Sequence, residues 1–206
     1  MTARPFVIGV TGNIACGKSL VLRTLADLGA ATIDADTVYH GLIAPGEPLW
    51  GVLRDRFGPG IIAPDQSIDR RALGRLVFSE PNLLAELDAL THPAVVLAIQ
   101  RQIAESLAQV VAVDAVKLIE SGLDRSCDAV WVVICRPEQS VERLMRRNDL
   151  SRDDASARVV AQPSGEANLV RSGLVIENSG TRDQTRTQVI RGWRNALRLD
   201  TTEKIV

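Results

Sequence analysis

The sequence predicts an α/β fold in which a parallel sheet of about five strands is covered by helices. Three observations support this prediction. Short apolar, β-branched runs alternate with segments whose apolar residues recur at helical spacing. A glycine-rich turn follows the first of these runs, and a long helical stretch separates the second run from the third. Alternating strands and helices favour parallel pairing, because each helix returns the chain to the same edge of the sheet.

Five runs have the length and composition of buried strands. They are largely apolar, which is typical of a parallel sheet covered on both faces. The second run stops at Asp34 and the third at Asp114. The predicted strands are residues 6–10, 31–33, 110–113, 129–134 and 174–176.

Helical patterns fill most of the sequence between these strands. Residues 18–28 carry a stripe of leucine and valine that ends before Gly29, a typical helix stop. Residues 137–161 are helical and rich in arginine. Residues 182–197 form the predicted final helix.

The longest helical stretch runs from about residue 36 to residue 108, and it is interrupted at several places. We therefore expect one domain over residues 1–206 that contains a helical insertion at approximately residues 37–108. The expected interruptions are at residues 58–60, Pro64, Pro81 and Pro93.

Composition limits the class of protein. The chain is 46% hydrophobic and 24% charged, as is usual for a globular protein, and it has no apolar run near the roughly 18 residues of a membrane helix. The first residues lack the features of a signal peptide, and the three cysteines form no cluster, so we expect a cytoplasmic protein. A formal net charge of −1 predicts no general attraction to nucleic acid or membranes. The sequence does not predict an oligomeric state.

The segment G-N-I-A-C-G-K-S at residues 12–19 fits the pattern G-x-x-x-x-G-K-[ST], with a strand before it and a helix after it. Glycines let several backbone N–H groups converge on one phosphate, at the positive end of the following helix. Lys18 is expected to bind the outer phosphates of a nucleotide, and the Ser19 hydroxyl to ligate Mg²⁺. The alternative is an ordinary glycine-rich turn with a solvated lysine. The predicted nucleotide-binding residues of this loop are Gly12, Asn13, Ile14, Ala15, Cys16, Gly17, Lys18, Ser19 and Leu20.

Two classes of P-loop protein remain open at this point: a kinase for a small molecule, or a switch or motor that hydrolyses its nucleotide. The N-K-x-D string of guanine-nucleotide switches is absent from the sequence, and so is a strand that ends in adjacent acids. These observations favour the kinase. In addition, the place of Cys16 at a helix N-terminus predicts a lowered thiol pKa and a reactive cysteine.

Asp34 and Asp36 follow the second predicted strand, where an open α/β sheet binds its ligands. One of the two is expected to cap the next helix, a common role of aspartate. The other is expected to accept a hydrogen bond from the attacking alcohol and to take its proton late in phosphoryl transfer.

Here the sequence resembles the dephospho-CoA kinase family over nearly its whole length. The resemblance rests on G-V-T-G-N-I-A-C-G-K-S at 9–19 followed by I-D-A-D at 33–36, and on further stretches in the same order. These are D-R-R-A-L at 69–73, T-H-P at 91–93, E-R-L-M-R-R-N-D at 142–149, A-R-V-V-A-Q at 157–162 and V-I-E-N-S-G at 175–180.

The resemblance implies a P-loop kinase with a nucleotide core, a helical CoA-binding insertion and a lid at approximately residues 137–165. It implies that ATP phosphorylates the ribose 3′-hydroxyl of dephospho-CoA, with Asp36 as the catalytic aspartate. The family's P-L-L-F-E is replaced here by residues 116–120, where Leu118 and Glu120 match and Lys117 adds a charge. Glu120 is predicted to contact the substrate. The effect of the altered segment is not predicted.

Six arginines lie between residues 136 and 158. The helical spacing of Arg143, Arg146 and Arg147 places them on one face. That face is either solvated or part of a lid that folds guanidinium groups over ATP and excludes water. Positions that match the family make Arg147 the predicted catalytic residue and Arg143 and Arg152 predicted ATP contacts.

Other candidates have weaker support from the sequence. Arg70 and Arg71 are predicted to bind the pyrophosphate of CoA, without a ranking between them. His92 is a predicted substrate contact, although Thr91 and Pro93 also fit the cap and first turn of a new helix. Asn178 is predicted to lie at the adenine pocket, where Asn is also an ordinary turn residue. Asp114 is a candidate to orient Mg²⁺ through water.

Two alternatives to a dephospho-CoA kinase remain open. One is a P-loop kinase for another small hydroxylated acceptor, such as a nucleoside. The other is a nucleotide-binding regulator that has lost catalysis through the altered segment at residues 116–120.

Overall fold

The computed structural model describes residues 4–162 and 169–203, with side chains described as far as residue 197. The chain forms two compact units. We call residues 1–33 together with 103–206 the core unit, and residues 34–102 the helical unit. The predicted insertion at 37–108 and the helical unit differ in their bounds by a few residues at each end.

Five strands form one sheet in the order β2-β3-β1-β4-β5, and the three described pairs are parallel. β1 is therefore central, with Val10 opposite Asp114 of β3 and Thr11 opposite Val132 of β4. The arrangement confirms the predicted α/β fold and its five strands. The strands are β1 Phe6–Thr11, β2 Ala31–Asp34, β3 Val110–Asp114, β4 Ala129–Ile134 and β5 Leu174–Glu177.

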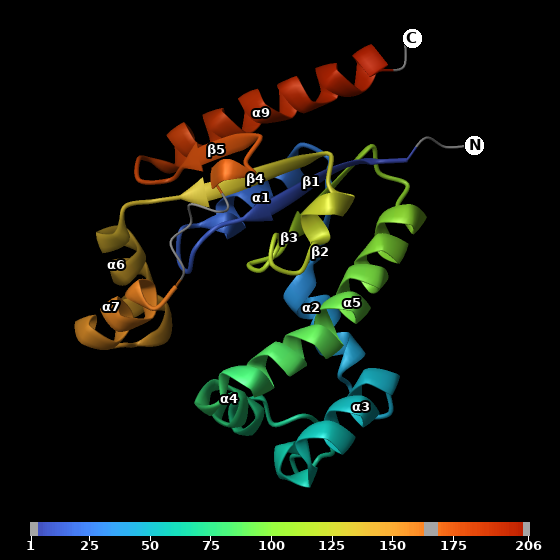
Figure 1. Ribbon diagram of the computed structural model, residues 1–206. Coiled ribbons are helices and arrows are strands. Elements are labelled where there is room, and N and C mark those ends of the chain that lie inside the picture. Colours follow the sequence, from blue (N-terminus) through green and yellow to red (C-terminus); the bar gives the residue numbers. More distant parts are fainter. Residues whose placement is uncertain (1–3, 163–168, 204–206) are drawn as a thin grey trace. The chain divides into compact units, whose positions relative to one another are not determined.

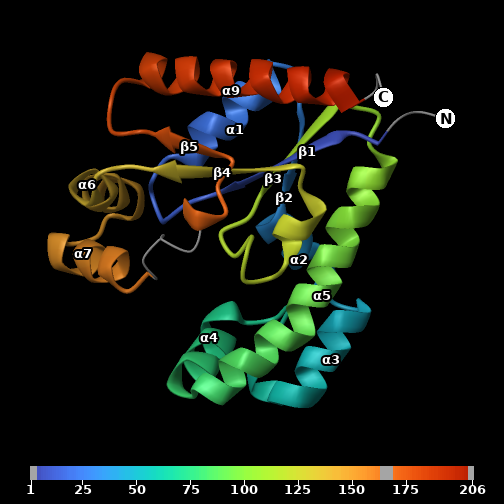
Figure 2. The same cartoon turned by 45° about the horizontal axis from the view of Figure 1, so that its top comes forward.

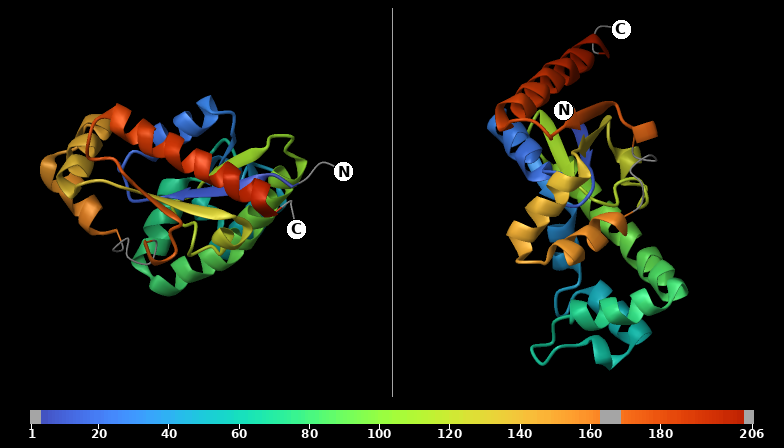
Figure 3. Two further views of the ribbon diagram at one scale, coloured as in Figure 1. Left: turned by 90° about the horizontal axis from the view of Figure 1, so that it is seen from above. Right: turned by 90° about the vertical axis from the view of Figure 1, so that its left-hand side faces the viewer.

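The helices α1 (Lys18–Asp27) and α9 (Arg182–Glu203) pack against each other on one face of the sheet (Figures 1 and 3). α6 (Pro137–Asn148) and α7 (Arg152–Val160) lie beyond the end of β4 and pack together (Figure 2). The arginine-rich stretch is thus two helices, because Asp149 takes a left-handed φ of 51° and Ser151 caps α7. Residues 163–165 of the predicted lid lie outside the described residues.

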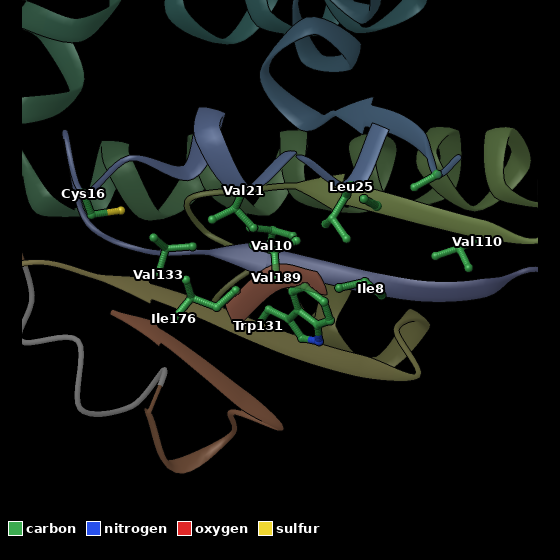
Figure 4. Close-up of a cluster of buried hydrophobic side chains, with 12 residues drawn as sticks. Ile8, Val10, Cys16, Val21, Leu25, Val110, Trp131, Val133, Ile176 and Val189 are labelled. Carbon is green, nitrogen blue, oxygen red and sulfur yellow. The ribbon is translucent and has the colours of Figure 1, made fainter. Parts of the chain in front are cut away.

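The main core lies between the sheet and the helices α1 and α9 (Figure 4). Ile8 and Val10 of β1 meet Val21 and Leu25 of α1, and all four are fully buried. Trp131 of β4 completes the cluster beneath α9. Because β1 and α1 are both locked into this core, the loop that joins them has fixed ends.

The helical unit has its own core, formed by the apolar faces of its helices. Pro93 lies inside a single long helix, so the predicted break and new helix start at Thr91 are wrong. Thr91 is not a cap, since its hydroxyl donates to the Leu87 carbonyl of the same helix at 2.8 Å. The elements are α2 Ala35–Leu42, α3 Pro48–Phe57, the short 3-10 helix η1 Pro59–Ile61, α4 Arg70–Ser79 and α5 Pro81–Glu105.

By length and composition, α5 could cross a membrane, which the sequence analysis did not predict. Some of its apolar side chains serve the packing of the helical unit, since Leu83, Leu87 and Leu90 pack against its core. The prediction of no membrane partner stays a prediction.

Candidate active site

The glycine-rich loop joins β1 to α1, as the sequence predicts, and its two outer glycines are required by the geometry. Gly12 has φ 148°, and a Cβ there would lie 2.2 Å from the Val133 carbonyl oxygen. Gly17 has φ 99°, and a Cβ there would lie 1.9 Å from the Asn178 side-chain nitrogen. A side chain at residue 12 would displace the backbone of β4, and one at residue 17 would displace the Asn178 side chain. Together with the positive φ angles, these clashes require glycine at both positions.

Lys18 and Ser19 begin α1 at the end of the loop. The Lys18 ammonium donates to the Gly12 carbonyl at 3.0 Å, which holds the lysine across the loop. The Ser19 hydroxyl is exposed, and among the described residues it makes no hydrogen bond. Its oxygen is therefore available to a hard cation such as Mg²⁺, which fits the predicted role.

The segment after β3 is held beside the start of the loop. The Ala115 N–H donates to the Val10 carbonyl at 3.1 Å, and the Thr11 hydroxyl donates to the Val116 carbonyl at 3.0 Å. The altered segment at 116–120 thus begins next to the phosphate loop. Lys117 and Glu120 are exposed, and Leu118 is buried. The predicted contact of Glu120 with substrate stays a prediction.

α6 and α7 contact the loop directly. Ile14 and Ala15 pack against a small apolar cluster formed by Val141, Leu144 and Ala155. The Gln162 side-chain oxygen accepts a hydrogen bond from the Ile14 N–H at 2.6 Å. The predicted lid helices are therefore joined to the phosphate loop through both apolar and polar contacts.

The three arginines predicted to share one face of α6 have different surroundings. Arg143 is half-buried and donates to the carbonyls of Ala15, Cys16 and Asn178 at 3.3, 3.0 and 2.8 Å. Arg146 is exposed and pairs with Glu142 at 3.7 Å. Arg147 is exposed, and within the described part of the chain it donates only to its neighbour Asn148, at 3.0 Å. Arg143 thus holds the loop, whereas Arg147 is accessible to a ligand.

Arg152 is exposed at the first position of α7. Its predicted contact with ATP, like that of Arg143, is not tested by any described interaction.

Asn178 follows β5, and its side chain points into the protein. It is 5% exposed, donates to the Cys16 carbonyl at 2.7 Å, and accepts from the Thr185 hydroxyl at 2.7 Å. Both ends of the amide are thus occupied by protein groups.

The Cys16 thiol is fully buried beneath Gly12, so the predicted lowering of its pKa is wrong. Burial raises the pKa to about 11, and the nearby Lys18 charge and hydrogen bond only partly oppose it. A helix N-terminus lowers a thiol pKa, but here the loss of water around a side chain that points into the core outweighs that effect.

We therefore expect Cys16 to resist alkylation in the folded protein. At pH 8, a thiol with a pKa of about 11 is ionised roughly 100-fold less than one at the ordinary value of 9.0. The measurement is the rate of iodoacetamide labelling of the Cys16 peptide between pH 7 and 10, in native and urea-unfolded protein. Native labelling should be slow and should rise with pH over this range. Labelling at pH 7 as fast as in urea would contradict the burial argument.

In the helical unit, Asp34 is the aspartate that caps α2. Its carboxylate accepts from the N–H groups of Asp36 and Thr37 at 2.8 and 3.1 Å. This confirms that one member of the pair is a cap and shows which one. Within its own unit, among the described residues, the Asp36 carboxylate makes no hydrogen bond, and it follows β2 by two residues. Asp36 is therefore the member of the pair that is available for chemistry.

Three other predicted substrate residues, Arg70, Arg71 and His92, also lie in the helical unit. Arg70, the first residue of α4, contacts the His40 ring of α2. His40 is one helical turn after Asp36, so the two side chains share a face of α2. Arg71 is exposed at the second position of α4, and the capping residue Asp69 accepts from its N–H at 2.9 Å.

Next to Arg70, burial raises the pKa of Tyr39, while the arginine opposes this rise. His92 lies one turn after Asp88 on α5, and its ring is 3.3 Å from the Asp88 carboxylate. The predicted contact of His92 with substrate stays a prediction.

The sequence reasoning missed three residues with structural roles at these places: His40, Gln162 and Thr185. His40 had a usable signal, because it is one of only two histidines and is spaced four residues from Asp36. Gln162 stands at the end of a stretch that carried the family resemblance. Thr185 had none, since its partner Asn178 is brought to it only by the packing of α9.

Comparison with known proteins agrees with this geometry. A family model described as dephospho-CoA kinase matches residues 6–184. The chain belongs to the dephospho-CoA kinase family. This confirms the family predicted from the sequence, and with it an ATP-dependent kinase of the P-loop type.

Several known proteins are similar to the chain over most of its length. It is 44% identical over 193 residues to the dephospho-CoA kinase of Symbiobacterium thermophilum. The aligned region covers 92% of this chain and 81% of that relative. The crystal structure of TT1252 from Thermus thermophilus has a TM-score of 0.82 at 31% identity, over 95% of this chain and 99% of that one. The dephospho-CoA kinase from Campylobacter jejuni has a TM-score of 0.67 at 27% identity, over 91% and 95% of the two chains.

Proposed function

We propose that this protein transfers the γ-phosphoryl group of ATP to the ribose 3′-hydroxyl of dephospho-CoA, giving CoA and ADP in coenzyme A biosynthesis. The observation that carries this proposal is the family match over residues 6–184, which includes both the phosphate loop and the helical unit. The loop supports it with its two required glycines and with Lys18 at the start of α1. We place the reaction in the cytoplasm, as the sequence predicts.

Mg²⁺ is the cation that we expect to accompany ATP. The Ser19 hydroxyl would hold it, together with the phosphates and water, and Asp114 at the end of β3 would orient one of those waters. Bound there, Mg²⁺ would offset the negative charge that develops during phosphoryl transfer. Lys18 would leave the Gly12 carbonyl for the β- and γ-phosphates, a move that its flexible stem permits.

Asp36 would orient the acceptor hydroxyl and take its proton at the end of the transfer. Arg70 and Arg71, at the start of α4, would bind the pyrophosphate of dephospho-CoA. The contact between Arg70 and His40 supports this proposal, because it places the cation against the same face of α2 that carries Asp36.

Arg147 would stabilise the transferring phosphoryl group. Arg147→Lys should lower kcat/KM for ATP by about tenfold, because a lysine cannot reproduce two parallel charge-assisted hydrogen bonds. Arg146→Lys is the matched control, since Arg146 is exposed on the same helix and pairs with Glu142. Initial rates over a range of ATP concentrations distinguish the variants. Equal kinetics of the two variants would assign Arg147 to the solvated face of α6.

The function itself is tested by acceptor-dependent release of ADP in a coupled assay. Purified protein with Mg-ATP should release ADP rapidly with dephospho-CoA and only slowly with adenosine, AMP or no acceptor. Faster turnover with adenosine or AMP would favour a kinase for another hydroxylated acceptor. No turnover with any of them would favour a nucleotide-binding regulator.

A further inference from the structure

The buried pair of Asn178 and Thr185 is placed behind the phosphate loop, where the function proposed above uses no side chain. Asn178 follows β5 and Thr185 lies in the first turns of α9. Thr185 is fully buried and Asn178 nearly so. Buried polar side chains need hydrogen-bond partners within the protein, and both side chains of this pair have them.

The pair holds one carbonyl of the loop in a fixed direction. Asn178 Nδ2 donates to the Cys16 carbonyl at 2.7 Å, and Arg143 Nη1 donates to the same oxygen at 3.0 Å. Arg143 Nη2 also donates to the Asn178 backbone carbonyl at 2.8 Å, which ties the two donors together. A carbonyl oxygen with two donors has little freedom to rotate.

Fixing this carbonyl also fixes an N–H of the loop. The Cys16 carbonyl and the Gly17 N–H belong to one planar trans peptide, in which the two bonds point in opposite directions. Holding the oxygen toward Asn178 therefore aims the Gly17 N–H away from it. Among the described residues, the Gly17 N–H meets no acceptor, as is expected of a group kept for a phosphate oxygen.

Thr185 determines which end of the Asn178 amide faces the loop. Its hydroxyl donates to Asn178 Oδ1 at 2.7 Å, and a second, longer contact reaches the Thr181 carbonyl at 3.3 Å. Because the hydroxyl has one proton, the shorter contact keeps the oxygen of the amide toward α9. The nitrogen must then face the Cys16 carbonyl.

Gly17 completes this arrangement, because the Asn178 amide nitrogen occupies the space that a Cβ at position 17 would need. We infer that Asn178 and Thr185 are positioning residues that hold the Gly17 N–H for phosphate binding, and that Asn178 does not select adenine. The inference rests on the proposed function only in requiring that the loop binds the phosphates of ATP.

The test compares ATP with inorganic triphosphate, a ligand that has the phosphates and no base. Three variants are used: Asn178→Asp, which replaces the donor with a charged acceptor, Thr185→Val, which removes the hydroxyl at constant size, and Thr185→Ser, which restores it. Thr187→Val is the matched control, because Thr187 is exposed two residues further along α9. The Kd of each Mg²⁺ complex is measured by titration, the Tm by thermal unfolding, and kcat with dephospho-CoA.

We expect Thr185→Val to raise the Kd for ATP and the Kd for inorganic triphosphate by the same factor, about tenfold. This is the size expected for the loss of one buried hydrogen bond. Asn178→Asp should weaken the binding of both ligands by a larger factor. Thr185→Ser should bind both ligands almost as tightly as the wild type. Thr187→Val should match the wild type.

Weaker ATP binding with unchanged triphosphate binding would show that Asn178 contacts adenine and would overturn the inference. A lower Tm with both affinities unchanged would also overturn it, since the pair would then serve stability alone. If Asn178→Asp does not fold, the two Thr185 variants decide the question. If wild-type protein turns over no dephospho-CoA but the two affinities fall together, the proposed function fails and this inference stands.

Discussion

Asp36→Asn should lower the rate of phosphoryl transfer by about 10² to 10⁴, the usual contribution of a positioned general base. The asparagine keeps the size and the hydrogen bonding of the side chain but cannot take the proton of the acceptor hydroxyl. ATP and dephospho-CoA should therefore bind with nearly unchanged Kd. Single-turnover transfer from γ-labelled ATP measures the chemical step, and equilibrium titration measures the two affinities.

Asp34→Asn is the matched control for this prediction. Asparagine caps helices as well as aspartate does, so the cap on α2 should survive and the transfer rate should stay near that of the wild type. Asp34→Ala should instead cost about 1 kcal/mol of stability through the lost cap. A fast Asp36→Asn enzyme beside an inactive Asp34→Asn enzyme would reverse the two assignments.

Lys18→Ala should lower kcat/KM for ATP by about 10² to 10³, which is comparable to removing one preorganised charge-stabilising donor. The variant should fold, because the lysine ammonium bonds only to the Gly12 carbonyl among the described residues and does not enter the core. Steady-state kinetics over a range of ATP concentrations give the size of the effect. Thermal unfolding checks that the protein is intact.

The control for Lys18→Ala is Arg23→Ala, which removes one positive charge from an exposed position of the same helix. It should have kinetics close to those of the wild type. If both variants lose activity equally, the loss is caused by the reduced positive charge of α1 and not by the position of Lys18. If Lys18→Ala keeps full activity, the assignment of the phosphate loop is wrong.

The parts of the structure that depend on local sequence were predictable. The strands are short apolar runs whose burial does not depend on distant partners, so their positions were predicted to within a residue or two. The phosphate loop was also predictable, because its backbone angles require glycine at residues 12 and 17.

What depends on packing was not predictable. Arg143 and Arg147 lie one helical turn apart on the same face of α6. Among the described residues, however, Arg143 donates to loop carbonyls, whereas Arg147 donates to its neighbour Asn148. Cys16 sits at a helix start, but its thiol points into the core, and burial outweighs the helix. Pro93 lies within a continuous α5, although the sequence at that point resembles a helix start.

The proposed residue roles rest on the contacts within each unit and on the family match. The sequence predicted Lys18 and Asp36 from motifs that are local in the chain. It did not predict the hydrogen bonds behind the loop, because Asn178 and Thr185 come from segments more than 150 residues away from it.

The most direct test of the proposed function is the identity of the product. The protein is incubated with Mg²⁺, γ-labelled ATP and dephospho-CoA, and the phosphorylated product is analysed by mass spectrometry and by ³¹P NMR coupling to the ribose protons. We predict one labelled product with the mass of CoA, with its new phosphate on the ribose 3′-oxygen and one ADP formed for each transfer. Label on another oxygen, or consumption of ATP that does not depend on dephospho-CoA, would contradict the proposed function.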